Sequence, residues 1–283
     1  MLDKAFLEIT NTCNLACDFC AGTARAPRRM SEDEFERLTD RLTGRVRYLY
    51  FHLMGEPTTH PLLADFARRA REKGFRPMLT TNGTRLGAVG EGLLGAPFHK
   101  ISISLHAPAA NAAFADPHYF DHCIDFARRA AARGIITVLR LWNVGGTAYE
   151  RENAPILARL HAEFDGEWGE IRSGYRMAER LFLEWGTRFA WPHPDASALP
   201  PDAPCFCYAL RDQIGVLADG TVVPCCLDAE GRLALGNLHE SELDAILSSP
   251  RARALYEGFG AHRAVESLCR RCGYIQAHAY RQK

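Results

Sequence analysis

The sequence predicts an α/β fold in which a partial barrel of six parallel strands is followed by a small C-terminal domain. Three observations predict it. From Lys4 to about residue 186, short apolar runs alternate with longer amphipathic segments, which is the pattern of repeated βα units. A proline-dense stretch follows, and six of the ten cysteines lie beyond it. At 283 residues the chain exceeds a typical single domain, so we expect two domains.

The apolar runs are the predicted strands, and the segments between them are the predicted helices. The strands are Lys4 to Thr10, Arg47 to Leu53, Arg76 to Thr81, Lys100 to Leu105, Ile135 to Trp142 and Leu181 to Glu184. The helices are Ser31 to Thr43, Pro61 to Lys73, Arg85 to Leu94, Tyr119 to Arg133 and Ala148 to Phe164. Ser31 and Glu34 have the spacing of a capping box. Such a (β/α)6, TIM-like open barrel can keep a ligand-sized lumen, with active residues at the carboxyl ends of its strands.

Side chains alternate along a strand, and one face of successive predicted strands is polar. This face offers Glu8, Thr10, Tyr50, His52, Thr80, Asn82, Ser102, Ser104, His106, Arg140, Trp142 and Glu184. The opposite faces carry Leu7, Ile9, Phe51, Leu53, Ile101, Ile103, Leu105, Leu139 and Leu141, which suit packing under helices. Any single polar residue can also be an ordinary core group with its hydrogen bonds satisfied. Together they favour a lumen that holds a ligand.

The C-terminal part begins after a linker. We expect the barrel over residues 1–190, the linker over 191–204 and the second domain over 205–283. In that domain, Gln213 to Leu217 and Thr221 to Val223 flank a hairpin turn, and Ser241 to Leu247 and Arg251 to Phe259 have helical patterns. Residues 166–180 are rich in Gly, Arg and Glu and have no clear pattern; a connection over the barrel mouth is one option.

Composition narrows the classes of partner. Lys+Arg and Asp+Glu both total 34, so the charge balance gives no sign of nucleic acid and fits a small or neutral substrate. No 18-residue apolar stretch and no signal peptide are visible, so we expect no membrane association and a cytoplasmic protein. In that reducing compartment, cysteines are expected to be metal ligands or catalytic groups rather than disulfides.

Three cysteines directly follow the first predicted strand. Cys13, Cys17 and Cys20 supply three thiols within eight residues, with no fourth nearby. A [4Fe-4S] cluster held by three thiolates leaves one iron open to a substrate or cofactor. Zinc is the alternative, but it usually takes a second pair of ligands, and none is near in the first domain. This spacing, with Phe19 before the last cysteine, resembles the signature of the radical S-adenosylmethionine (SAM) enzymes, whose open iron chelates S-adenosylmethionine (AdoMet).

Further residues support this resemblance. Met54-Gly55-Glu56-Pro57 follows the second strand and resembles the family's Gly-Gly-Glu-Pro motif, although Met54 departs from the first glycine. The resemblance implies that Gly55 and Glu56 hold the amino group of AdoMet. By their placement at strand ends, the holders of its carboxylate and ribose are expected to be Asn82, Ser104 and Arg140. The adenine-binding Gly-rich pattern of some members is absent, so adenine contacts are not assigned.

The C-terminal cysteines resemble the SPASM or twitch extension of radical SAM enzymes, so the resemblance covers nearly the whole chain. It implies that an auxiliary [4Fe-4S] cluster is bound by Cys207, Cys225, Cys269 and Cys272. Cys205 and Cys226 are then spare, although either can replace one of the four. Six cysteines complete at most one auxiliary cluster, and a zinc ribbon remains the alternative. Cys123 lies in a helical run and is expected to be a buried small hydrophobe.

The resemblance implies reductive cleavage of AdoMet to a 5′-deoxyadenosyl radical, which takes a hydrogen atom from a substrate, with an electron donor such as flavodoxin or ferredoxin. The substrate candidates are Glu8, His52, His106, Arg140, Trp142 and Glu184, a mixture that suits a polar, purine-like heterocycle. The motifs Arg140-Leu141-Trp142-Asn143, Phe189-Ala190-Trp191-Pro192 and Cys207-Tyr208-Ala209-Leu210-Arg211 resemble a group of radical enzymes that includes the queuine lyases. That resemblance implies cleavage of the C–N bond of queuine, releasing 7-aminomethyl-7-deazaguanine for queuosine salvage.

Three other functions remain open. A maturase of a ribosomal peptide has the same plan but usually carries a further peptide-recognition domain, which is not expected here because the first strand begins at Lys4. A dehydrogenase or epimerase of a sugar-like substrate is the second. A non-enzymatic iron-sulfur or zinc protein is the third, and it has no need for an open iron or for Gly55-Glu56-Pro57.

Overall fold

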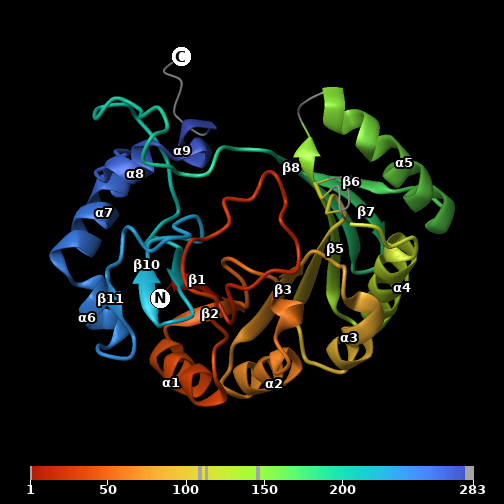
Figure 1. The fold of residues 1–283 in the computed structure, drawn as a ribbon, viewed down its shortest axis with the longest axis horizontal. Coiled ribbons are helices and arrows are strands. Elements are labelled where there is room, and N and C mark those ends of the chain that lie inside the picture. Colours follow the sequence, from red (N-terminus) through yellow and green to blue (C-terminus); the bar gives the residue numbers. More distant parts are fainter. Residues whose placement is uncertain (1, 108–109, 112–113, 145–146, 278–283) are drawn as a thin grey trace.

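A computed structural model describes residues 2–107, 110–111, 114–144 and 147–277, and within them it has one curved sheet (Figure 1). The spatial order of its strands is β11-β10-β9-β1-β2-β3-β4-β5-β8-β7-β6. Every neighbouring pair from β9 through β1 to β5 and on to β8 is parallel. The strands are β1 (Leu2–Leu7), β2 (Val46–Tyr50), β3 (Arg76–Thr81), β4 (Lys100–Ser104), β5 (Ile136–Val144), β6 (Gly169–Ile171), β7 (Gly174–Ala178), β8 (Leu181–Thr187), β9 (Gln213–Val216), β10 (Thr221–Val223) and β11 (Gly236–Asn237).

The predicted partial barrel is confirmed. Its six expected strands are β1 to β5 and β8, and helices lie on the outer side of the curved sheet (Figure 1). The helices of this part are α1 (Glu32–Leu42), α2 (Leu63–Glu72), α3 (Leu86–Leu94), α4 (Tyr119–Ala132) and α5 (Thr147–Glu163). The predicted capping box of α1 is present, with Ser31 and Glu34 bonding each other's backbone. The outer faces of the strands are buried under these helices, as at Phe51 and Ile103, both fully buried.

The connection from β2 to α2 is held by a buried histidine. A short 3₁₀ turn, η1 (Pro57–Thr59), ends at His60. The Nε2 atom of His60 lies 2.9 Å from the carbonyl oxygen of Met30, and its Nδ1 accepts a hydrogen bond from the amide of Leu62 at 3.2 Å. These partners fix a neutral imidazole with its proton on Nε2. In agreement, burial lowers the pKa of His60.

Residues 166–180 do not run over the barrel mouth. They contain β6 and β7, an antiparallel hairpin that pairs with β8 and lengthens the sheet at one edge. Both strands are short, and β6 is exposed along its length. Such strands leave little hydrophobic alternation for a sequence pattern to detect.

The C-terminal hairpin extends the opposite edge of the same sheet. β9 pairs in parallel with β1, at Lys4–Gln213 through Leu7–Val216, and β10 pairs with β9 in the predicted hairpin. The remaining helices are α6 (Leu243–Leu247), α7 (Pro250–Gly260), α8 (Ser267–Arg270) and α9 (Gly273–Ala277). The sheet therefore continues across the expected boundary near residue 205, and the division into barrel, linker and second domain stays a prediction.

The linker closes the side of the barrel between its two edges. It leaves β8 and crosses to the neighbourhood of α9 (Figure 1). One backbone hydrogen bond attaches it there, from Leu199 to Arg270 at 2.8 Å, and a second, from Gly273 to Ala190 at 2.9 Å, attaches the residue just before it. In the part of the chain that the structure describes, no helix has the length and apolar character needed to cross a membrane.

Candidate active site

The loop between β1 and α1 carries the three clustered cysteines and lies inside the curve of the sheet (Figure 1). Cys13, Cys17 and Cys20 all line one cavity of about 480 Å³, which we call the upper cavity. Each sulfur accepts an N–H hydrogen bond: Cys13 from the Leu15 backbone (3.5 Å), Cys17 from the Asn111 side chain (3.0 Å) and Cys20 from the Gly22 backbone (3.4 Å). Such bonds to sulfur are among the features that set the potential of an iron-sulfur cluster.

The donor set fits a [4Fe-4S] cluster with one open iron. All three cysteines are free thiols, come from one loop and face the same cavity. Burial raises the pKa of Cys13 to about 11, so iron must displace a proton when it binds. Among the described residues, no three His, Cys, Asp or Glu side chains are arranged to hold a single metal ion.

Gly55 packs directly against the cysteine loop. Its φ of +76° lies in the left-handed region. A Cβ atom at this position would lie 2.5 Å from the carbonyl oxygen of Thr10 and 2.9 Å from that of Thr12. The next residue, Glu56, donates its amide to the Thr12 carbonyl at 3.0 Å. Glycine is therefore required for the loop after β2 to reach the cysteine loop this closely.

The Glu56 carboxylate is buried in the wall of the upper cavity. Its Oε1 accepts hydrogen bonds from the Thr58 amide (3.0 Å) and from the hydroxyls of Thr58 and Thr81 (both 2.7 Å), and its Oε2 accepts one from the Asn82 amide (2.7 Å). Burial raises the pKa of Glu56, and these hydrogen bonds oppose the rise. The sequence motif identified this residue, but its supporting threonines had no signal of their own.

The other residues expected to bind AdoMet lie around the same cavity. Phe19, Asn82, Ser104 and Arg140 all line it, and so does His106, which was expected to contact the substrate. The Phe19 ring lies 4.9 Å from the His106 ring and 5.0 Å from the Arg188 guanidinium. Asn82 is oriented by a 3.0 Å hydrogen bond from its side-chain amide to Asn14 in the cysteine loop.

The C-terminal cysteines line a second cavity, of about 400 Å³, which we call the lower cavity. Cys207, Cys225, Cys269 and Cys272, the four expected ligands, are all in its wall. Cys226 also lines it, whereas the buried Cys205 lines neither cavity. Four thiols are the donors that an auxiliary [4Fe-4S] cluster needs. Cys205 does not share the cavity of these four thiols.

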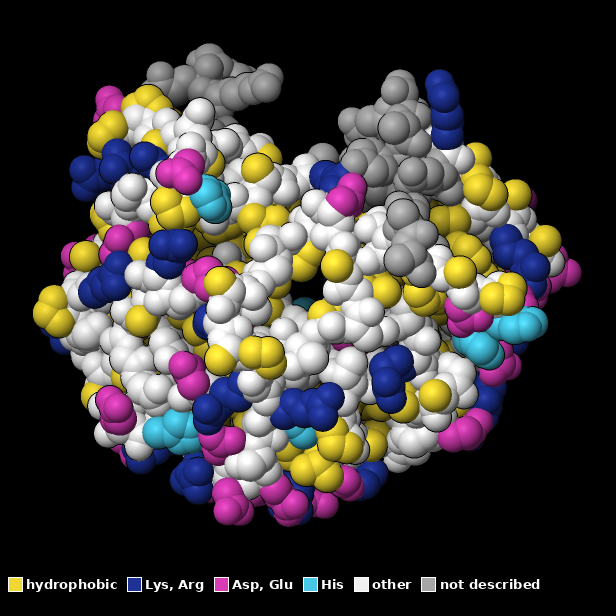
Figure 2. All heavy atoms as spheres, viewed as in Figure 1, with side chains coloured by type: hydrophobic (Ala, Val, Ile, Leu, Met, Phe, Trp, Pro, Cys, Tyr) yellow, Lys and Arg dark blue, Asp and Glu magenta, His cyan; other side chains and the backbone are white. Residues whose placement is uncertain are grey.

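The two cavities meet at a common wall. The residues that line both are His52, Thr80, Arg140, Cys226 and Leu227. Strands β3 and β5 supply Thr80 and Arg140, and the segment after β10 supplies Cys226. The face of the molecule seen in Figure 2 is hollowed near its centre, and charged side chains of both signs are interspersed over it. These five residues therefore border the cavities of both cysteine sets.

The buried histidines that line these cavities, His52 and His106, are neutral at physiological pH. Burial, with a smaller effect from Arg140, lowers the pKa of His52 to about 3, and His52 Nδ1 has no hydrogen-bond partner among the described residues. Burial lowers the pKa of His106 to about 4. Burial raises the pKa of Tyr50 to about 12, so its hydroxyl keeps its proton. These groups present neutral donors and acceptors to a bound molecule.

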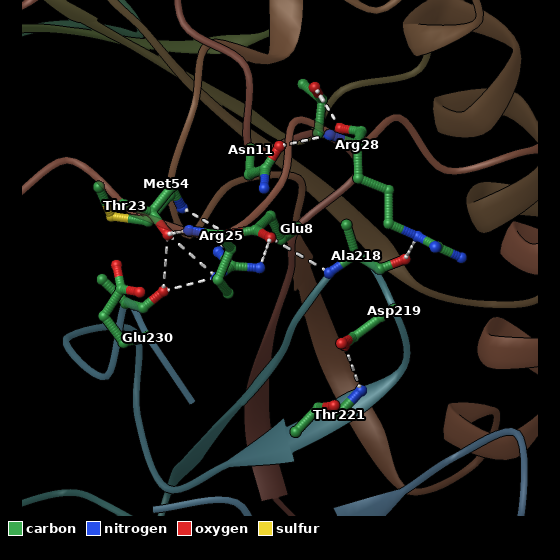
Figure 3. Close-up of polar contacts among 12 residues, drawn as sticks. Glu8, Asn11, Thr23, Arg25, Arg28, Met54, Ala218, Asp219, Thr221 and Glu230 are labelled. Carbon is green, nitrogen blue, oxygen red and sulfur yellow. Dashed lines mark hydrogen bonds and ion pairs between the residues drawn. The ribbon is translucent and has the colours of Figure 1, made fainter. Parts of the chain in front are cut away.

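The other residues expected to contact a substrate do not all lie in a cavity. Glu184 lines the lower cavity, where Lys100 Nζ lies 3.4 Å from its Oε1. Trp142 lies on β5, but its side chain is outside the described part of the structure. Glu8 is fully buried and lines neither cavity, because Arg25 from the cysteine loop covers it (Figure 3). Glu8 is therefore positioned to hold the loop rather than to contact a substrate.

Three residues at the site were not identified from sequence. Arg25 pairs with Glu8, Asn111 bonds the Cys17 sulfur, and Trp191 donates its indole N–H to the Phe19 carbonyl at 2.9 Å. Only the burial of Glu8 could have indicated a cation, since a buried carboxylate needs a partner. Asn111 belongs to a loop with no motif, and the motif Phe189-Ala190-Trp191-Pro192 contains Trp191 but gave no sign of its contact with Phe19.

Comparisons with known proteins agree with this geometry. The model of the radical SAM superfamily matches residues 7–153, and that of the SPASM iron-sulfur cluster-binding domain matches residues 205–273. A curated relative is the tungsten-containing aldehyde ferredoxin oxidoreductase cofactor-modifying protein of Pyrococcus furiosus, 35% identical over 85 residues, or 29% of this chain and 24% of that protein. Another is the PqqA peptide cyclase of Streptomyces rochei, 30% identical over 135 residues, or 46% of this chain and 37% of that protein.

Among solved structures, that of BtrN in complex with AdoMet and 2-DOIA matches 96% of this chain and 93% of its own, with a TM-score of 0.59 and 17% identity. This likeness shows a shared fold. The curated relatives named above are matched over less than two fifths of their own length. The two matching domains imply a [4Fe-4S] cluster, AdoMet and an auxiliary cluster. Because the first family model covers more than half of the residues, the chain belongs to the radical SAM superfamily of enzymes, with a C-terminal SPASM domain.

Proposed function

We propose that this radical SAM enzyme removes a hydrogen atom from a small polar molecule bound where the upper and lower cavities meet. The common wall carries the proposal, because His52, Thr80 and Arg140 line both cavities. A substrate there lies next to the cysteine loop on one side and the SPASM cysteines on the other. Both cavities have ligand-sized volumes.

The chain's own residues would hold the cofactors as follows. Cys13, Cys17 and Cys20 bind the first cluster, and Cys207, Cys225, Cys269 and Cys272 bind the auxiliary cluster. When bound, the first cluster and AdoMet supply a 5′-deoxyadenosyl radical after one-electron reduction. Glu56 would bind the ammonium group of AdoMet. Its Oε2 accepts one hydrogen bond from the described residues and can accept another. Gly55 lets that carboxylate lie beside the cysteine loop.

The lower cavity supports a substrate with both polar and flat apolar parts. Lys100, Arg140 and Glu184 supply charge, and Tyr50 supplies a protonated hydroxyl. The aromatic side chains of its wall are Phe6, Tyr50, Phe189, Tyr208 and Tyr274. Rings of this kind stack on planar heterocycles, and the charged groups bind their polar edges.

Queuine is the specific substrate that we propose, with C–N bond cleavage releasing 7-aminomethyl-7-deazaguanine. Its support is the set of sequence motifs and the mixed wall of the lower cavity; neither curated relative named above is described as acting on queuine. The proposal includes reduction by a flavodoxin or ferredoxin and location in the cytoplasm. Removal of a hydrogen atom from queuine leaves a substrate radical and 5′-deoxyadenosine.

Maturation of a ribosomal peptide is the second candidate. The 30% identity with the PqqA peptide cyclase over 135 residues favours it. A peptide would place one of its side chains against the same common wall.

Anaerobic reconstitution tests the proposal. The chain is loaded with iron and sulfide, reduced, and supplied with AdoMet alone, with queuine, or with a peptide encoded beside its gene. We expect 5′-deoxyadenosine from the wild type and from Cys123→Ala, whose thiol is buried in α4 away from both cavities, but none from Cys13→Ala. Bound zinc without AdoMet cleavage would overturn the enzyme proposal.

The same assay separates the substrates. Queuine should raise 5′-deoxyadenosine formation and should be converted to 7-aminomethyl-7-deazaguanine. Queuine labelled with deuterium should transfer the label to 5′-deoxyadenosine. If the peptide stimulates turnover and queuine does not, the maturase candidate replaces the queuine lyase.

A further inference from the structure

Glu8 and Arg25 form a two-point ion pair inside the protein (Figure 3). Arg25 Nη1 donates to Glu8 Oε1 at 2.8 Å, and Nη2 donates to Oε2 at 2.7 Å. The Glu8 side chain is fully buried and that of Arg25 is 17% exposed. Such parallel bonds fix the relative orientation of the two side chains as well as their distance.

The carboxylate of Glu8 also binds two backbone amides from other segments. Met54 donates to Oε2 and Ala218 donates to Oε1, each at 3.2 Å (Figure 3). Met54 directly precedes Gly55 and Glu56, and Ala218 follows β9. Four segments therefore meet at one carboxylate: the end of β1, the cysteine loop, the loop after β2 and the C-terminal hairpin.

Arg25 extends this junction toward the auxiliary cysteines. Its Nε donates to the Ala229 carbonyl at 2.8 Å, a few residues after Cys225 and Cys226. The neighbouring amide of Ala24 donates to Glu230 Oε1 at 2.9 Å. The loop that carries the first cluster's cysteines is thus bonded to the segment that carries auxiliary ones.

We propose, building on the function proposed above, that Glu8 and Arg25 are positioning residues that set the distance and orientation between the first cluster and the auxiliary cluster. A pair that merely stabilised the fold would also be costly to break, since one buried charge would remain. Its loss would also change the two amides bonded to Glu8, but it would leave the interaction between the clusters unchanged. The interaction between the clusters therefore distinguishes the alternatives.

The test uses the full chain loaded with both clusters. Glu8→Gln removes the charge that accepts four hydrogen bonds. Arg25→Lys keeps the positive charge but removes the second bond to Glu8, so it serves if the first variant fails to fold. Glu36→Gln is the matched control, because both Glu36 carboxylate oxygens are paired, with Arg69 and Lys73, and neither partner bonds Met54 or Ala218.

Two measurements need neither AdoMet cleavage nor a substrate. Hydrogen exchange measures how well the backbone amides of Met54 and Ala218 are protected. We expect about tenfold faster exchange in both variants, because the hydrogen bonds from these amides to a charged acceptor are weakened. Electron paramagnetic resonance of the doubly reduced protein reports the magnetic interaction between the clusters, which should change in both variants. Glu36→Gln should match the wild type in both measurements.

The proposal is overturned if Arg25→Lys lowers the unfolding midpoint but leaves the magnetic interaction between the clusters at its wild-type value, whatever the exchange of the two amides. It is also overturned if Glu36→Gln changes the magnetic interaction equally, since the effect would then belong to the loss of any paired carboxylate. Failure of the proposed function has a different signature, namely no 5′-deoxyadenosine from the wild type.

Discussion

Replacing Gly55 by alanine should damage both stability and AdoMet binding. The φ of +76° costs an alanine about 1–2 kcal/mol. Crowding adds about 1–3 kcal/mol, because the new Cβ would meet backbone atoms of Thr10, Asn11 and Thr12 within 3 Å, and these cannot rotate away as a side chain can. We therefore expect a loss of about 2–5 kcal/mol in the free energy of unfolding.

Gly44→Ala separates the two costs. Gly44 has nearly the same φ, +74°, but a Cβ there would have no neighbour within 4 Å. It should lose only the conformational cost, about 1–2 kcal/mol. Urea unfolding of the cluster-loaded variants under anaerobic conditions measures the difference, and titration with AdoMet measures binding. Equal losses in the two variants, or normal AdoMet binding by Gly55→Ala, would refute the reasoning.

Three further predictions concern the ligands of the auxiliary cluster, the reduction potential of the first cluster and the pH dependence of stability. Cys225→Ser should lose about four iron atoms per chain while Cys226→Ser keeps them, as measured by iron analysis; the reverse would exchange their roles. Asn111→Ala should make the first cluster's reduction potential more negative, because it removes the 3.0 Å N–H bond to the Cys17 sulfur; an unchanged potential in a redox titration would contradict this. Below its ordinary pKa of 6.5, His60 takes up a proton in the unfolded chain but stays neutral in the fold. Stability should therefore fall as pH drops below 6.5, and less so in His60→Gln; equal pH dependence of the urea midpoint would contradict it.

Alternation along the strands predicted much of the lumen. Tyr50, His52, Ser102, Arg140 and Glu184 were all expected on the polar face, and all line the lower cavity. This succeeded because parallel strands in a regular sheet keep their side chains strictly alternating. The first cysteine set could be proposed for a different reason, since spacing along a short loop constrains it directly, whereas the C-terminal set was proposed from a resemblance.

The same rule fails where a strand ends or another segment returns. By alternation, Glu8 belongs to the same strand face as Lys4 and Phe6, which do line the lower cavity. Arg25, however, folds back over Glu8 and covers it. Leu53 was expected under the helices, yet it joins a small apolar cluster with Phe6 and lines the upper cavity. Because β2 ends at Tyr50, the alternation no longer governs Leu53. Contacts of this kind depend on partners far along the chain.

The pairing of β9 with β1 has a consequence for how the protein is made. The amides of Asp3 and Lys4 donate to the carbonyl of Asp212, and that of Glu8 donates to the carbonyl of Val216. During synthesis, one side of the first strand therefore stays unpaired until some two hundred more residues have left the ribosome. An open apolar edge of this kind invites pairing with another chain. We expect ribosome-bound chains that stop before Gln213 to require chaperones, and iron loading to follow release of the finished polypeptide.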